Sequence, residues 1–218
     1  MFLGYALVSF IWSAVDSYHN EDFEKFFLYM TNHGKLILVV HGILSLILCL
    51  VQYRHFSTND KQRNRVSRVH IVSVFIQNNM LVLLCQISFS YWTIIFPRTG
   101  NTGWLSIQGH AVNTLIAIID VLISDLPFLM ITLFAHFAYG LIYVLVQVYM
   151  NCFTSHSYIY KDVIAWCTSK SLTSSNLQGF TFISAPSLSI SANIMALVVL
   201  PTAFHVLWFL VINKFIRR

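Results

Sequence analysis

The chain has 218 residues and a formal net charge of +5, yet only 10% of its residues are Asp, Glu, Lys or Arg. An ordinary soluble domain is about 25% charged. With 57% apolar residues and a mean hydropathy of +0.69, the composition excludes a soluble globular protein, which needs more polar surface. We therefore predict an all-α integral membrane protein, a single polytopic bundle of about six transmembrane helices over residues 1–218.

The apolar segments, taken in chain order, predict six spans, because about 20 apolar residues cross a bilayer as a helix. The first segment is short, and we interpret it as either a first span or the apolar core of a signal peptide. Pro127 is placed in the first turn of the fifth helix, and Pro201 predicts a kink in the sixth. The predicted spans are residues 2–15, 26–53, 71–96, 104–124, 127–150 and 192–213.

The connectors set the orientation. Residues 16–25 are acidic, whereas residues 54–70 and the C-terminal tail from Lys214 together hold eight of the thirteen basic residues. Basic connectors stay in the cytoplasm, and an even number of spans puts both basic segments on one side. We expect an integral protein of the plasma membrane or endoplasmic reticulum with both termini cytoplasmic. Membrane lipids are the expected partners; the basic excess does not indicate nucleic acid, and no protein partner is predicted.

The connector of residues 151–191 is rich in Ser and Thr and is expected on the opposite side of the membrane. It contains Cys152 and Cys167, which pair only if the loop faces an oxidising compartment, and the sequence leaves that open.

Polar side chains inside the second and third spans have separate expected roles. Lys35 is expected to extend to the membrane surface, whereas His41 lies deeper. The amides of the third span are expected to hydrogen-bond neighbouring helices. These amides are Gln77, Asn78, Asn79 and Gln86. On the sixth span, His205 is expected to be a packing residue.

The fourth span carries a polar stripe whose members step by three and four and so share one helical face. The stripe comprises His110, Asn113, Ala117, Asp120 and Ser124, and the aliphatic side, which is expected to face lipid, comprises Leu115, Ile116, Ile118, Ile119 and Leu122. Ionisable groups in a bilayer face the bundle interior. The stripe is therefore either an internal site or a structural network. His110 and Asp120 are about 15 Å apart along the helix and cannot share an ion.

A second polar face on the fifth span is expected to meet this stripe. It comprises His136, Gly140, Tyr143 and Gln147. The hypothesis is a polar intramembrane network of Asn113, Asp120, His136 and Tyr143. No metal site or cofactor is predicted, and no nucleophile elbow, phosphate-binding glycine loop or His-Glu-x-x-His motif occurs.

Several short motifs resemble the rolling stone-like family of membrane proteins. The segment of residues 27–32, Phe-Leu-Tyr-Met-Thr-Asn, resembles the aromatic start of that family's second span. His110 and Asn113, with Asp120 and Pro127, resemble its fourth span. On the fifth span, His136, Gly140 and Tyr143 resemble the family's following helix. Tyr158-Ile159-Tyr160 with Trp166 resembles a loop motif. The chain departs from the family pattern at His33, Lys161 and Ala165.

The resemblance implies a multi-pass membrane protein acting in cell–cell or membrane processes such as myoblast fusion, without demonstrated catalysis. The family is more distantly similar to the androgen-induced membrane hydrolases, which cleave fatty acid esters of hydroxy fatty acids with a threonine and a histidine. Their motif positions fall on Thr31 and His110. The alternative is therefore an intramembrane ester hydrolase, with Thr31 as nucleophile and His110 as base in one shared cavity. Transport is a third class, but no inverted repeat is found.

Overall fold

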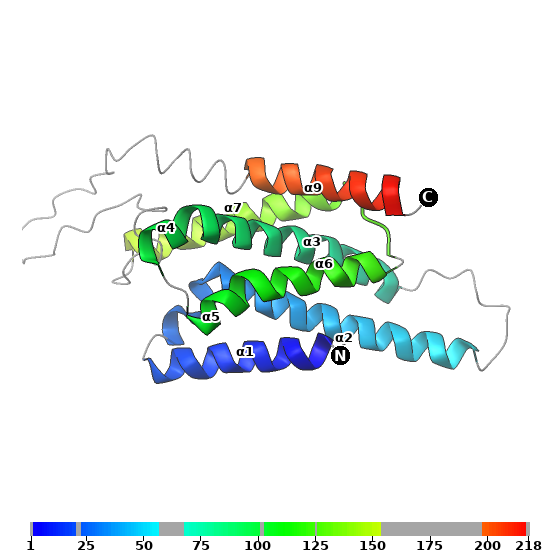
Figure 1. Cartoon of the computed structure of the whole chain (residues 1–218), viewed down its shortest axis with the longest axis horizontal. Helices are drawn as coiled ribbons and strands as arrows, with labels where there is room; N and C mark the ends of the chain where they lie inside the picture. Colours follow the sequence, from blue (N-terminus) through cyan, green and yellow to red (C-terminus); the bar gives the residue numbers. More distant parts are fainter. Residues whose placement is uncertain are drawn as a thin grey trace, which may run out of the picture.

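Figure 1 shows the computed structural model of the chain, which describes residues 2–20, 23–56, 68–100, 103–124, 126–153 and 198–216. Within these residues the chain forms helices and short connections, and no strand occurs among them. The longer helices are α1 (Phe2–His19), α2 (Met30–Phe56), α3 (Arg68–Ser90), α6 (Asn113–Ile123), α7 (Thr132–Phe153) and α9 (Leu200–Leu210).

Short helical segments extend or precede these helices. They are the 3-10 helix η1 (Phe23–Leu28), the short helices α4 (Phe96–Thr99) and α5 (Trp104–Ile107), and the π-helical segments η3 (Tyr91–Ile95), η4 (Gln108–Val112) and η6 (Val211–Ile216). A π-helical turn inserts an extra residue into a helix and is frequent at functional sites. Two of these segments, η3 and η4, interrupt otherwise apolar helices.

Three helical stretches are long and apolar enough to cross a membrane: Met30–Val51, Val69–Thr93 and Trp104–Ile123. A shorter apolar stretch follows at Thr132–Gln147. These stretches confirm, for the described part of the chain, the prediction of an all-helical membrane protein.

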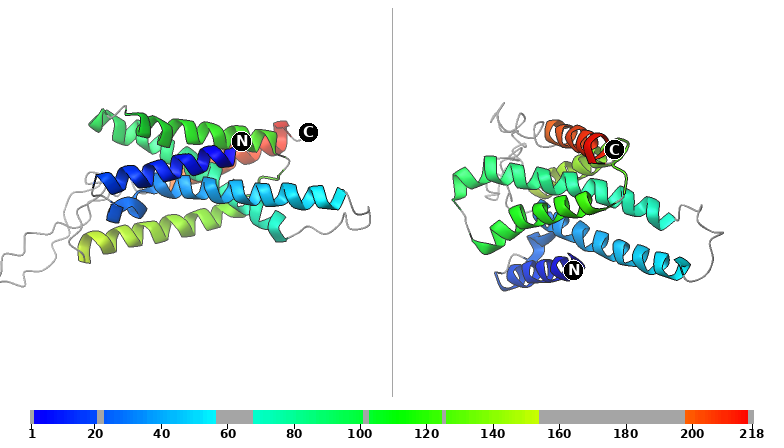
Figure 2. Two further views of the ribbon diagram at one scale, coloured as in Figure 1. Left: turned by 90° about the horizontal axis from the view of Figure 1, so that it is seen from below. Right: turned by 45° about the vertical axis from the view of Figure 1, so that its right-hand side comes forward.

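The helix α3 lies at the centre of the bundle, in contact with α2, α6, α7 and α9 (Figures 1 and 2). The segment Met80–Leu84 is almost fully buried, because neighbouring helices cover it on every side. The core around it includes Ala6, Leu38, Val39, Ala117, Val121, Phe128 and Ile212. The run of apolar residues from Met80 to Leu84 thus marks the middle of the central helix.

The outer helices present apolar side chains outward, as a surface in contact with hydrocarbon requires. On α6, Leu115, Ile119 and Leu122 are exposed, in agreement with the lipid-facing side predicted there. The prediction was wrong for Ile116 and Ile118, which pack against the core.

The second span does not begin as predicted at Phe26. Residues up to Leu28 form η1, and α2 starts at Met30. The side-chain amide of Asn32 donates to the carbonyl of Phe26 at 2.8 Å, which holds η1 against the first turn of α2. The apolar pattern runs through this break because both segments are buried or lipid-facing.

The fifth helix begins at Thr132, so the placement of Pro127 in its first turn was wrong. Residues 126–129 are not helical, and side chains from other helices bind their backbone. Asn213 donates to the carbonyl of Phe128 at 2.9 Å. The amide of Asn78, in the orientation that satisfies it, donates to Pro127 and accepts from Leu129.

Some predictions concern residues outside the described ranges. These include residues 192–197 of the sixth span, the loop motif between Tyr158 and Trp166, and Cys167 with its pairing to Cys152. Pro201 lies in the first turn of α9.

Candidate functional site

The start of α2 touches η4 at a glycine. Thr31 and Lys35 are four residues apart on α2 and so share one helical face. A Cβ built on Gly109 would lie 2.9 Å from Cγ2 of Thr31 and 3.8 Å from Nζ of Lys35. The glycine therefore permits this close approach, and it places Thr31 beside the residue that precedes His110.

His110 is held by stacking. Its ring lies on the ring of Tyr91, with centroids 3.6 Å apart and planes 6° from parallel. Tyr91 begins η3 and His110 lies in η4, so the two π-helical segments face each other here. His110 is buried, and within the described structure its Nδ1 has no hydrogen-bond partner. This ring nitrogen is therefore free to accept or donate a proton.

Lys35 is 3% exposed, so the prediction that it extends to the membrane surface was wrong. Its ammonium donates a hydrogen bond to the hydroxyl of Ser13 on α1. The helix α1 covers this side of α2 and leaves the lysine no path to the surface, since Ser13 is itself buried. Burial of a charged group is costly unless a partner compensates the charge. Because a hydroxyl is neutral, the ammonium group of Lys35 favours an additional partner that carries negative or partial negative charge.

Amides from η4 and α6 complete this region. Gln108 donates to Ser9 and, at 3.2 Å, to Tyr5, and Tyr5 donates to Asn113 at 2.9 Å. Among the described residues, Oε1 of Gln108 and Nδ2 of Asn113 are buried without a partner. We call these side chains together the Gly109 cluster. It comprises Ser9, Ser13, Thr31, Lys35, Gln108, His110 and Asn113.

A second group, the Asp120 cluster, takes one residue from each of α2 and α3 and two from α6 and its C-terminal end. Oδ2 of Asp120 lies 2.8 Å from Nε2 of His41 and accepts from the amide of Gln77 at 3.2 Å. The same amide donates to Ser124 at 2.7 Å. The Asp120 cluster (His41, Gln77, Asp120 and Ser124) thus joins α2, α3 and the end of α6, as the sequence suggested for Gln77.

The polar face of α7 does not meet that of α6 as predicted, because α3 packs against both helices. Nε2 of His136 lies 2.7 Å from Oε1 of Gln86 on α3. Tyr143 and Gln147 both donate to the carbonyl of Leu28 at 2.8 Å. The four residues predicted to form one network therefore have separate partners: Tyr5 for Asn113, His41 for Asp120, Gln86 for His136 and the Leu28 carbonyl for Tyr143.

The remaining sequence-selected polar residues are buried. His205 is fully buried, with Nε2 3.1 Å from the hydroxyl of Thr132, in keeping with a packing residue. Asn79 donates to the carbonyl of Phe75 in its own helix at 2.8 Å rather than to a neighbour.

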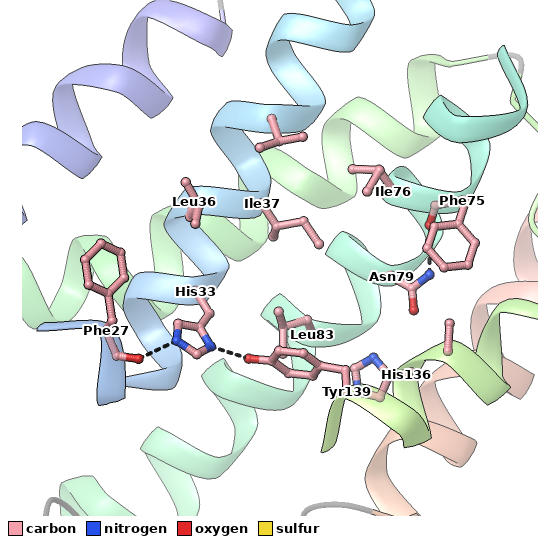
Figure 3. Close-up of a pocket in the computed structure, with 12 residues that line it drawn as sticks. Phe27, His33, Leu36, Ile37, Phe75, Ile76, Asn79, Leu83, His136 and Tyr139 are labelled. Carbon is pink, nitrogen blue, oxygen red and sulfur yellow. Dashed lines mark hydrogen bonds between the residues drawn. The ribbon is translucent and has the colours of Figure 1, made fainter. Parts of the chain in front are cut away.

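A pocket of about 440 Å³ lies on the other face of α2, between α2, α3 and α7 (Figure 3). Its lining includes His33, Ile37, Asn79, Leu83 and Tyr139, whereas neither Thr31 nor His110 contributes to it. The shared cavity expected for those two residues is thus not this pocket. The pairing of His33 with Tyr139 was not predicted, because the two residues are 106 apart in the chain and no local pattern relates them.

Within the described residues, no group of three or more His, Cys, Asp or Glu side chains is placed to hold a metal ion. Comparison with known proteins adds no constraint, since no family model, no curated protein and no solved structure matches the chain. The two polar clusters and the pocket are therefore the features that bear on function.

Proposed function

We propose that the chain is a six-span membrane protein of the rolling stone-like kind, and that it hydrolyses a lipid ester at the Gly109 cluster. The observation that carries the catalytic part is the close approach of the Thr31 methyl group to Gly109, next to His110, whose Nδ1 is buried without a partner among the described residues. A threonine hydroxyl is a weak nucleophile and needs a base close by. The buried Lys35 ammonium group adds a positive charge at the same place.

The reaction uses these three side chains. Oγ1 of Thr31 attacks the ester carbonyl carbon, while His110 takes the hydroxyl proton on a ring nitrogen. The bond to the alcohol oxygen breaks, and the alcohol leaves with that proton. Water then attacks the acyl-threonine with His110 as base, which releases the acid and restores Thr31. The ammonium group of Lys35 stabilises the negative oxygen that develops on the carbonyl.

The test of this activity is hydrolysis of fatty acid esters of hydroxy fatty acids, together with labelling by a fluorophosphonate probe. Thr31→Ala and His110→Ala are each expected to lower kcat/KM by about 10³-fold or more. Thr93→Ala is the matched control, because that hydroxyl is exposed and bonds the carbonyl of Phe89 in its own helix. Full turnover by Thr31→Ala would refute the assignment of the nucleophile.

The proposed topology adds α1, α7 and the segment from α9 to η6 as spans to the three long apolar helices, with both termini cytoplasmic. Support comes from the chain ends, which lie at the same end of the bundle as the end of α2 (Figures 1 and 2). Single cysteines at Asn20, Arg63 and Arg217 in a cysteine-free background test it. A membrane-impermeant thiol reagent should label the cysteines at positions 63 and 217 from the same side of the membrane, and the cysteine at position 20 from the opposite side. Labelling of positions 63 and 217 from opposite sides contradicts six spans.

The second candidate, a non-catalytic role in cell–cell or membrane processes, is favoured by the buried hydrogen bonds of the family-like residues, which make them structural. Asp120, His136 and Tyr143 each have a partner within the bundle. A content-mixing assay between cells that express the chain tests this role. Fusion that is enhanced equally by the wild type and Thr31→Ala would favour it over hydrolysis.

A further inference from the structure

The pocket between α2, α3 and α7 is a separate feature from the Gly109 cluster. His33 and Thr31 are two residues apart on α2, so they point to nearly opposite sides of the helix. The walls are formed mainly by aliphatic and aromatic side chains, among them Ile37, Val40, Ile76 and Leu83. A ligand here would not touch the proposed catalytic residues.

The pocket opens where hydrocarbon surrounds the helices. Its α2 and α3 walls belong to two stretches that are long and apolar enough to cross a membrane, Met30–Val51 and Val69–Thr93. Leu36, Val40 and Phe75 line the pocket and are also exposed, so its rim continues into the outer apolar surface. The volume of about 440 Å³ falls in the lower part of the range for small-molecule sites, ~300–1,000 Å³. A lipid chain from the bilayer fits this setting better than a water-soluble ligand.

The pocket contains no carboxylate, lysine or arginine, and the basic side chains in its lining are the imidazoles of His33 and His136. Nε2 of His33 lies 2.5 Å from the carbonyl of Phe27, and Nδ1 lies 2.7 Å from the hydroxyl of Tyr139. A carbonyl only accepts, so Nε2 carries a proton; with a neutral ring, Nδ1 then accepts from Tyr139. Figure 3 shows both bonds at one side of the pocket. The His33–Tyr139 pair is thus a hydrogen-bonded polar group at one side of the pocket.

Asn79 supplies a further polar atom. Its amide nitrogen donates to the Phe75 carbonyl, and its side-chain oxygen points away from that bond in Figure 3. Because an amide oxygen accepts hydrogen bonds, it suits a hydroxyl group on a ligand better than an ionised carboxylate.

We propose that this pocket binds one acyl chain of a neutral, hydroxyl-bearing single-chain lipid, such as a monoacylglycerol, that enters sideways from the bilayer. The tail lies against Val40, Phe75 and Ile76, and the polar end lies at the His33–Tyr139 pair. The site is independent of ester hydrolysis at Thr31.

The test is photolabelling of the full-length protein in nanodiscs with a diazirine-bearing monoacylglycerol, followed by peptide mapping. Label is expected on α3 and α7. Ala135→Phe, which fills the pocket, is expected to lower labelling about tenfold. Ala138→Phe is the matched control, because Ala138 lies on the same helix but is exposed, and it should label like the wild type. Should Ala135→Phe fail to fold, Val40→Trp blocks the pocket from its exposed rim and is expected to have the same effect.

Two further measurements separate the outcomes. Unlabelled monoolein is expected to compete for the site, and oleate to compete much less; equal competition would overturn the neutral head group. Thr31→Ala should leave labelling unchanged even where it abolishes hydrolysis, so failure of the catalytic proposal does not affect this one. Label spread over α6 and unaffected by Ala135→Phe or Val40→Trp would mean bulk lipid contact only and would overturn the proposal.

Discussion

Replacing Gly109 by alanine tests the approach of Thr31 to η4. The added Cβ would lie 2.9 Å from Cγ2 of Thr31, and 3.7 Å and 3.8 Å from Cε and Nζ of Lys35. Optimal carbon–carbon contacts are about 3.5–4.0 Å, so the Thr31 methyl must move by about 0.6–1.1 Å. The lysine contacts are ordinary and require no shift. The change therefore acts mainly on Thr31.

The displacement has two calculable effects. A reacting group moved by about 1 Å loses about 10²-fold in rate, so Gly109→Ala is expected to lower kcat for ester hydrolysis by that factor. Overpacking costs about 1–3 kcal/mol, whereas alanine is better than glycine in a helix by about 1 kcal/mol. The net loss of folding free energy is then about 0–2 kcal/mol, small beside the loss of activity.

Gly4→Ala is the matched control, because a Cβ at Gly4 of α1 meets nothing within 4 Å. It should retain full activity, and its free energy of unfolding should rise by up to about 1 kcal/mol. Both variants are compared by unfolding in detergent and by lipid-ester hydrolysis. Wild-type turnover in Gly109→Ala, with stability equal to that of Gly4→Ala, would show that Thr31 does not lie against η4 during the reaction.

Three further predictions test the interior. Asp120→Ala removes two hydrogen bonds between helices. Each such bond contributes ~0.6 kcal/mol on average and at most ~1.7 kcal/mol, so the free energy of unfolding is expected to fall by about 1–3 kcal/mol. An unchanged free energy of unfolding would refute the role of Asp120 in joining the helices. Gly42→Val places a Cβ 3.2 Å from Cα of Leu3, a backbone atom that moves only with its helix, so it should destabilise the packing of α1 on α2 more than Gly4→Val does in the same unfolding assay. Lys35→Met should leave unfolding nearly unchanged, since it replaces a buried charge by an apolar chain of similar length, while lowering kcat about 10²-fold; equal kcat would remove Lys35 from the reaction.

The membrane fold could be predicted because apolar composition and segment length are direct consequences of the bilayer. The three long helical stretches follow from apolar segments of sufficient length, although each contains polar residues: Met30–Val51, Val69–Thr93 and Trp104–Ile123. Helix ends were predicted less well, since side-chain hydrogen bonds stabilise other backbone there: Asn32 bonds the 3-10 helix at Phe26, and Asn78 bonds the non-helical backbone at Pro127. Hydropathy is averaged over many residues and does not register single hydrogen bonds, so a helix predicted from hydropathy extends past the residues where these bonds end it.

The sequence also indicated that Thr31 and His110 lie at similar depth, because each comes near the start of a span on one side of the membrane. Their neighbours were not predictable. Tyr5 and Asn113 are 108 residues apart, and His33 and Tyr139 are 106 apart, so no periodicity within a single helix relates them. Polar residues of α1 were overlooked for the same reason: Ser9 and Ser13 matter only where α1 meets Gln108 and Lys35.

Distance along the helix explains why the predicted stripe divides into two clusters. His110 and Asp120 are about 15 Å apart along the helix axis, so their side chains meet different parts of the bundle. His110 stacks on Tyr91, whereas Asp120 bonds His41. Asn113 and Ala117, which lie between them, are fully buried, so the stripe stays on the inner face of the helix. The polar face thus supplies one cluster beside Gly109 and a second, around Asp120, that joins the three long helices. Each cluster holds buried atoms without a partner among the described residues, including Nδ1 of His110 in the first and Nδ1 of His41 in the second. Asp120 bonds two other helices, whereas His110 lies beside the proposed nucleophile. An Asp120 variant should therefore lose folding free energy first and a His110 variant activity first.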